Sequence, residues 1–281
     1  MIRTGTLLDF KASPAYVLPS LQVIRRFQGD WYRIRSELVR SIRALDSEAN
    51  EEIIVSAYVT PTLRNLSLAD GIRETFRLLP DGKQCLQSYD RRRLPGYLTR
   101  LGLQLINVDE STARLIPFLL ENHDSARTAA TISEIAAELQ DLGFRGLERS
   151  TRLRGWMDFL DYVYLTRTHR GRLYILRTQY EVFKRGEKRP SMREYADALK
   201  SSYDVSRFRT YGSPYVPIPD LREQTCGKLG ITSFTFDEYL TKLVRIQAPI
   251  QLVLATPTEK VRGGITFSGK YYYLLALYHK R

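Results

Sequence analysis

The stretch that decides the fold occupies residues 128–176 and reads TAATISEIAAELQDLGFRGLERSTRLRGWMDFLDYVYLTRTHRGRLYIL. Its first part carries apolar residues at the spacing of an amphipathic helix, namely Ile132, Ile135, Ala136 and Leu139. Leu142-Gly143 is a typical helix end. A second helix is expected from about Ser150, because apolar residues again share one face, at Leu153, Trp156, Met157 and Leu160.

The end of this stretch favours a β-hairpin. Segments 162–166 and 172–176 are rich in β-branched and aromatic residues, which is typical of strands. The connecting residues are Arg167, Thr168, His169, Arg170 and Gly171. The stretch therefore predicts a helix, a turn, a second helix and a basic hairpin.

The same order of elements is expected twice more. In the first copy, a helix at about 31–45 precedes a short helix for which Thr60 is the expected N-cap and Pro61 the first residue. A turn then begins at Asp70-Gly71, and a strand at 76–79 ends in a turn at 80–83.

The third copy opens after a turn-rich junction at 211–214. We expect one helix from Pro219, another from Phe236, and a hairpin that pairs segment 251–256 with segment 264–267. Between the copies, segments 91–110 and 111–122 favour further helices, and Ser191 with Glu194 forms a capping box for a helix that follows. The expected units are residues 1–94, 95–184 and 191–281, with 185–190 as a charged connector.

These stretches resemble the winged helix-turn-helix superfamily. The residues that carry the resemblance are TPTLRNLSLADGIRETFRLLPDGK at 60–83 and ISEIAAELQDLGFRGLERSTRLRGWMDFLDYVYL at 132–165. Three such units in a row also resemble the DNA-recognition region of type IIS restriction endonucleases. The resemblance implies an α+β fold, mainly helical, with three tandem winged-helix units, each a helix-turn-helix plus a β-hairpin wing.

The resemblance further implies that the second helix of a unit enters the major groove while its wing touches the backbone or minor groove. In the middle unit, Glu148, Thr151, Gly155 and Asp158 are expected opposite the buried stripe. The guanidinium fork suits contacts with phosphate and guanine. The residues expected to contact DNA are Arg145, Arg152, Arg154, Arg167, His169, Arg170 and Arg172 in the middle unit, Arg64, Arg73, Arg91, Arg92 and Arg93 in the first, and Lys242, Lys260 and Arg262 in the third.

The composition agrees with a polyanionic partner. The 281 residues include 43 Lys and Arg against 31 Asp and Glu, a formal charge of +12. Because no run of about twenty apolar residues exists and the first residues lack a signal-peptide core, we expect no membrane partner and a cytoplasmic, nucleoid-associated protein. Cys85 and Cys226 lie far apart without metal-ligand spacing, so neither a zinc site nor a disulfide is expected.

An enzymatic role is considered and disfavoured. Asp70, Asp81 and Lys83 superficially match the carboxylates and lysine of restriction-type nucleases, but Asp-Gly and Asp-Gly-Lys are also hairpin signals. Phosphate-binding loops, HExxH helices and GxSxG turns are missing from the sequence. We therefore expect no catalytic residues, no metal, no cofactor and no small-molecule ligand.

The sequence thus predicts a non-catalytic protein that binds double-stranded DNA. It would be the DNA-reading subunit of a larger restriction, anti-phage or mobile-element system, with partner protein subunits. One alternative is a tandem winged-helix scaffold in a multi-subunit complex, which the acidic Glu148 and Asp158 favour. A further alternative is a transcription regulator, which would be expected to dimerise on a palindromic site.

Overall fold

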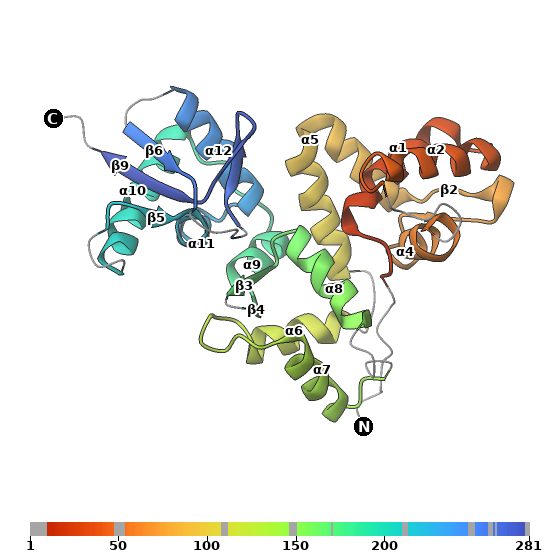
Figure 1. The fold of residues 1–281 in the computed structure, drawn as a ribbon, viewed down its shortest axis with the longest axis horizontal. Coiled ribbons are helices and arrows are strands. Elements are labelled where there is room, and N and C mark those ends of the chain that lie inside the picture. Colours follow the sequence, from red (N-terminus) through yellow and green to blue (C-terminus); the bar gives the residue numbers. More distant parts are fainter. Residues whose placement is uncertain are drawn as a thin grey trace. The chain divides into compact units, whose positions relative to one another are not determined.

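The chain is mainly helical, with small antiparallel sheets, as expected from the sequence (Figure 1). The computed structural model describes residues 10–47, 54–107, 112–145, 151–169, 171–209, 213–246, 251–257, 261 and 263–278. The chain divides into two compact units, Met1–Ile175 and Leu176–Arg281. Unit 1 holds two helix–hairpin modules and unit 2 holds one.

The first module contains α1 (Val17–Phe27), α2 (Trp31–Arg43), the short helical segments η2 (Ile54–Val59) and α4 (Thr60–Asn65), and the hairpin of β1 (Ala69–Asp70) with β2 (Arg77–Leu78). Helix α2 forms because Ile34, Leu38 and Ile42 share one fully buried stripe and the Asp30 side chain caps its start by accepting the Arg33 N–H at 3.1 Å. Thr60 is not an N-cap, because the helical run begins upstream and its hydroxyl instead donates to the Val55 carbonyl at 2.7 Å.

The turn expected at 80–83 is wrong, because these residues begin the long helix α5 (Pro80–Asn107). Pro80 fits the first helical position, where its missing N–H costs nothing, and Asp81 favours the positive end of the helix dipole. Gly82 is required by packing, since a Cβ there would overlap the Leu68 carbonyl. The expected boundary between residues 94 and 95 falls inside α5.

The second module contains α6 (Thr112–Asn122), α7 (Ile132–Asp141), α8 (Thr151–Tyr162), β3 (Thr166–His169) and β4 (Arg172–Ile175). Both expected helices and the hairpin are confirmed, and the predicted stripe of α8 is buried. Helix α8 extends to Tyr162, so the first strand starts later than expected. Ala130 adds a third strand-like pairing by exchanging backbone hydrogen bonds with Leu173.

An N-terminal strap, residues 10–16, joins the two modules of unit 1. The Phe10 ring is 3% exposed and lies 4.5 Å from the Trp156 ring and 4.9 Å from the Phe159 ring, both on α8. The Ala12 N–H donates to Thr62 Oγ1 on α4 at 3.2 Å. A Cβ on Gly155 would overlap the Phe10 carbonyl, so this position of α8 is fitted to the strap.

Unit 2 begins with α9 (Arg177–Arg185) and continues with α10 (Met192–Arg209), β5 (Val216–Pro217), α11 (Ile218–Leu229) and α12 (Ser233–Ile246). Its strands are β6 (Gln251–Ala255), β7 (Ile265–Phe267), β8 (Lys270–Tyr272) and β9 (Leu274–Tyr278). The elements from α10 to β9 form the third module. The expected end of the middle unit at residue 184 falls in the last turn of α9, which belongs to unit 2.

The hairpin expected between 251–256 and 264–267 is wrong. Strand β6 pairs with β9, with Val253 opposite Ala276, and β7 pairs with β8, so the sheet has the order β5-β9-β6. Alternating hydrophobicity identifies strands but does not determine which strands pair with one another. The β7–β8 hairpin is therefore an excursion within the connection from β6 to β9.

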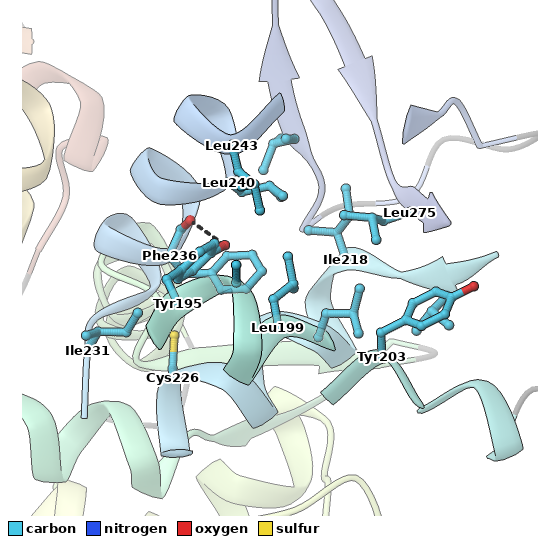
Figure 2. Close-up of a cluster of buried hydrophobic side chains, with 14 residues drawn as sticks. Tyr195, Leu199, Tyr203, Ile218, Cys226, Ile231, Phe236, Leu240, Leu243 and Leu275 are labelled. Atoms are coloured by element: carbon cyan, nitrogen blue, oxygen red, sulfur yellow. Dashed lines mark hydrogen bonds between the residues drawn. The ribbon is translucent and has the colours of Figure 1, made fainter. Parts of the chain in front are cut away.

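The core of the third module lies between its helices and β9. Figure 2 shows Tyr195 and Leu199 of α10 directed toward Leu240 of α12, with the Tyr195 hydroxyl donating to the Phe236 carbonyl at 3.1 Å. The predicted capping box at the start of α10 is confirmed. The Ser191 N–H donates to the Glu194 carboxylate at 2.6 Å, and the Glu194 N–H donates to Ser191 Oγ at 3.2 Å.

Candidate nucleic-acid interface

The exposed face of α8 carries mixed charge. Thr151, Arg154, Asp158 and Asp161 are exposed on it, whereas Arg152 is half-buried. The prediction that Gly155 belongs to this face is wrong, because the strap covers it. A surface that offers one guanidinium between two carboxylates attracts phosphate only weakly. Glu148 lies outside the described residues.

The hairpin of the second module uses one of its arginines to hold the module together. Arg172 on β4 donates to both carboxylate oxygens of Glu134, at 2.6 and 2.7 Å. These bonds, with those to the capping residue Thr131, lower the pKa of Glu134 to about 2. Arg172 therefore ties the hairpin to the start of α7, although its side chain remains 51% exposed.

The other predicted residues of this module are spread along it. Arg145 is exposed just after α7, and Arg167 on β3 is half-buried. The side chain of His169 and the whole of Arg170 lie outside the described residues. The structure therefore does not bring the predicted hairpin residues into one described cluster.

In the first module, Arg64 is occupied at the base of its hairpin. Its Nε lies 3.2 Å from Asp70 Oδ1, and the guanidinium also donates to the Gly71 carbonyl. Arg73 is exposed in the loop between β1 and β2, and Arg91 is exposed on α5. The side chains of Arg92 and Arg93 lie outside the described residues.

In the third module, Lys242 forms an ion pair with Glu238 at 2.6 Å, one turn earlier on α12. Lys260 and Arg262 lie outside the described residues. Sequence reasoning missed Arg245, whose guanidinium lies 5.9 Å from the centre of the Phe267 ring and so connects α12 with β7. The sequence did not predict that β7 pairs with β8, and so it did not predict that Phe267 on β7 lies near Arg245.

The base of the β7–β8 hairpin is held by a buried ion pair. Arg222, 4% exposed, donates to Asp237 Oδ1 at 2.7 and 2.9 Å and to the Gly263 carbonyl at 2.6 Å. Burial raises the pKa of the Asp237 carboxyl, and the guanidinium opposes that rise. The Tyr271 hydroxyl also accepts the Gly264 N–H at 2.7 Å. The hairpin therefore extends from a fixed base.

The surplus of positive charge is uneven along the chain. Residues 108–185 hold 12 Lys and Arg against 11 Asp and Glu, whereas residues 10–107 hold 15 against 10 and residues 186–281 hold 15 against 9. The middle region, where seven of the fifteen DNA-contacting residues were expected, is thus nearly neutral. The sequence analysis did not single out the arginines of α2. The spacing of Ile34, Leu38 and Ile42 defines the buried stripe of this helix and so places arginines on the opposite side.

The carboxylates of the disfavoured nuclease pattern each contact an arginine. Asp70 pairs with Arg64, and Asp81 pairs with Arg100 at 2.8 Å. Lys83 is exposed in the first turn of α5. Within the described ranges, no three His, Cys, Asp or Glu side chains are grouped so as to hold a metal ion.

Both cysteines are free and buried. Among the helices in the described part of the chain, none has the length and apolar character needed to cross a bilayer. Comparison with family models, with curated proteins and with solved structures found no match to this chain.

Proposed function

We propose that this chain binds duplex DNA through tandem winged-helix modules and catalyses no reaction itself. The observation that carries the proposal is the topology of the third module. A helix, a short strand and two helices are followed by four strands, β6 to β9. In the three-stranded sheet the last strand, β9, lies between β5 and β6, and the β7–β8 hairpin belongs to the connection from β6 to β9. This is the arrangement expected of a winged helix, in which α12 would be the recognition helix and the β6–β9 connection the wing.

The second module repeats that order, and the first module shares its helices and terminal hairpin but has no described short strand after its first helix. In the second module, α6, the bridge at Ala130, α7, α8 and the β3–β4 hairpin follow one another. In the first module, α1 packs on α2 and on β2, and the helical run from η2 to α4 leads into the β1–β2 hairpin. Several modules with related plans give one chain more than one place at which to contact a polymer.

Net charge supports a polyanion as that polymer. A formal charge of +12 raises the local concentration of phosphate around the chain, and arginine contacts release condensed counterions from DNA. A chain that binds DNA without a catalytic activity of its own fits the DNA-reading subunit of a restriction, anti-phage or mobile-element system. Such a subunit would act in the cytoplasm with partner subunits. That assignment rests on the resemblance to type IIS recognition regions.

A second candidate function, a protein-interaction scaffold, is favoured by the middle module. Helix α7 carries Glu134, which pairs with Arg172, Glu138, whose Oε2 lies 2.8 Å from His123 Nε2, and Asp141. On the exposed face of α8, Asp158 and Asp161 flank Arg154. A face of this kind suits a basic protein partner better than phosphate. The two functions are compatible if the first and third modules bind DNA and the second module binds another subunit.

A mobility-shift titration of the full chain tests the proposal. The probes are a 20-base-pair duplex of random sequence and polyglutamate with a matched number of charges. We expect the duplex to be retarded and polyglutamate to compete poorly, because phosphates spaced along a rigid duplex match fixed arginines. Equal binding of the two polymers, or no binding to the duplex at low salt, would contradict DNA binding.

A further inference from the structure

Helix α2 presents a row of arginines on the side opposite its buried stripe. Arg33 and Arg40 are two turns apart and Arg43 is nearly one turn further, so all three project outward, on the same side as Ser36. The side chains of Arg33 and Arg40 are 71% and 82% exposed. The row is distinct from the hairpins and from the helices that lead into them.

The ion pairs that the row forms with nearby carboxylates are solvent-exposed. Arg33 Nε lies 3.3 Å from Asp30 Oδ2, and Arg40 lies 3.7 Å from Glu37. Ion pairs this exposed contribute little to stability, so either guanidinium can exchange its partner for a phosphate. Within α2 the sequence carries four arginines and the carboxylate of Glu37, and Asp30 at the N-cap pairs with Arg33.

The geometry of the row fits a phosphate backbone. Arg43 lies ten positions after Arg33, which corresponds to about 15 Å along the helix axis. Successive phosphates of one DNA strand advance by about 3.4 Å along the duplex, so the row reaches several of them. All the cations of α2 are arginines, whose planar fork binds phosphate oxygens in pairs.

A lipid surface fits the row less well. Helices that lie on membranes bury an apolar face among the acyl chains. The apolar stripe of α2 is already buried in the protein, since Ile34, Leu38 and Ile42 are each at most 1% exposed. The outward face therefore offers charge without the apolar anchor that an interfacial helix needs.

We propose that the outward arginine row of α2, consisting of Arg33, Arg40 and Arg43, binds the sugar–phosphate backbone of duplex nucleic acid without reading its sequence. The inference rests on the proposed function and adds a binding surface to it. Backbone contacts of this kind fix the position of a protein on the duplex, and base contacts elsewhere select the sequence.

The test compares two triple variants of the full chain. R33Q/R40Q/R43Q removes the row, and R189Q/R193Q/K200Q removes three exposed charges from unit 2 as a matched control. The affinity of each for a random 20-base-pair duplex is measured across salt concentrations, and circular dichroism verifies folding. We expect the slope of log K against log salt to lose about 2 to 3 units in the row variant, at about 0.9 per phosphate contact, and less than half as much in the control.

Vesicles with 30% phosphatidylserine supply a second arm. If the salt slope falls equally in the two triple variants, the α2 arginines contribute only through net charge and the inference is overturned. Duplex binding by the wild-type chain would in that case still support the proposed function. A row variant that loses vesicle binding but keeps duplex binding would also overturn it, in favour of a lipid surface. A wild-type chain that binds no duplex would overturn the proposed function and the inference together.

Discussion

At the scale of single residues, two short-range polar arrangements follow from the sequence and one contact does not. The Ser191–Glu194 capping box is readable because both partners lie within one helical turn. Its counterpart, Thr131 with Glu134, uses the same spacing. The Arg172 contact with Glu134 joins residues 38 positions apart, so only folding places them together. A hairpin arginine taken for a DNA contact is thus partly structural.

Stability should depend on pH through Glu134. The pKa of its carboxyl falls from 4.5 to about 2 on folding, so the ionised form binds Arg172 and stabilises the folded state above pH 4.5. That contribution is lost as the pH falls from 4.5 toward 2. We expect E134Q to lower the thermal midpoint at pH 6 and the two proteins to converge near pH 2. A gap of constant size across this range would show that the ion pair does not contribute.

The cysteine thiols should resist modification in the folded protein. Cys85 is fully buried, and burial raises the pKa of its thiol to about 12, while burial also raises that of Cys226. We expect iodoacetamide at pH 8 to label neither residue until urea unfolds the chain, as followed by mass spectrometry. Rapid labelling of Cys85 without urea would contradict its position in the core.

At the scale of elements, periodicity locates helices better than it pairs strands. The stripe of α8 and the end of α7 are readable because the 3.6-residue repeat is local. The partner of β6 is not readable, because β9 begins 19 residues after β6 ends and the nearer β7 is also apolar. The start of α5 was missed because Pro-Asp-Gly-Lys suits a turn as well as a helix N-terminus.

Adding one methyl group at Gly155 should displace the N-terminal strap and lower the free energy of unfolding. In G155A, the added Cβ meets the Phe10 carbonyl, so the strap must shift and Phe10 must leave its aromatic neighbours. We expect a loss of stability of up to about 3–5 kcal/mol, the usual range for removing a buried Phe side chain. Urea unfolding measures the change.

The matched control for that experiment is G227A, another glycine-to-alanine change within a helix, α11. Its Cβ would meet only the tip of the Thr178 side chain at 3.3 Å, so we expect a shift within about 1 kcal/mol. If the two variants lose equal stability, the strap does not hold unit 1 together.

At the scale of the whole molecule, the sequence predicted three repeated modules, and it did not predict that the chain divides into two compact units. The order of helices and hairpins recurs three times in the sequence, but the strap and α5 combine two of these modules in one compact unit. Both features depend on distant contacts, such as that between Ala12 and Thr62. The set of arginines available to DNA differs from the prediction for the same reason. Only the folded structure shows that Arg172 pairs with Glu134 and that Arg64 pairs with Asp70.

Unit 2 should fold by itself. Its core is drawn from α10, α11, α12 and the strands of one module, with Tyr195, Leu240 and Leu275 among the buried residues. We expect a fragment of residues 176–281 to unfold in a single cooperative transition, as measured by circular dichroism in urea. A fragment with helical signal but no cooperative transition would show that its core needs the rest of the chain.

We propose above that exposed arginines of this chain bind the backbone of duplex DNA. The most direct test is the association constant of the full chain with a random 20-base-pair duplex, measured by fluorescence anisotropy from 50 to 300 mM NaCl. We expect a linear fall of log K with log salt and a slope of magnitude at least about 3, corresponding to several released counterions. A flat line, or no association at 50 mM NaCl, would contradict it.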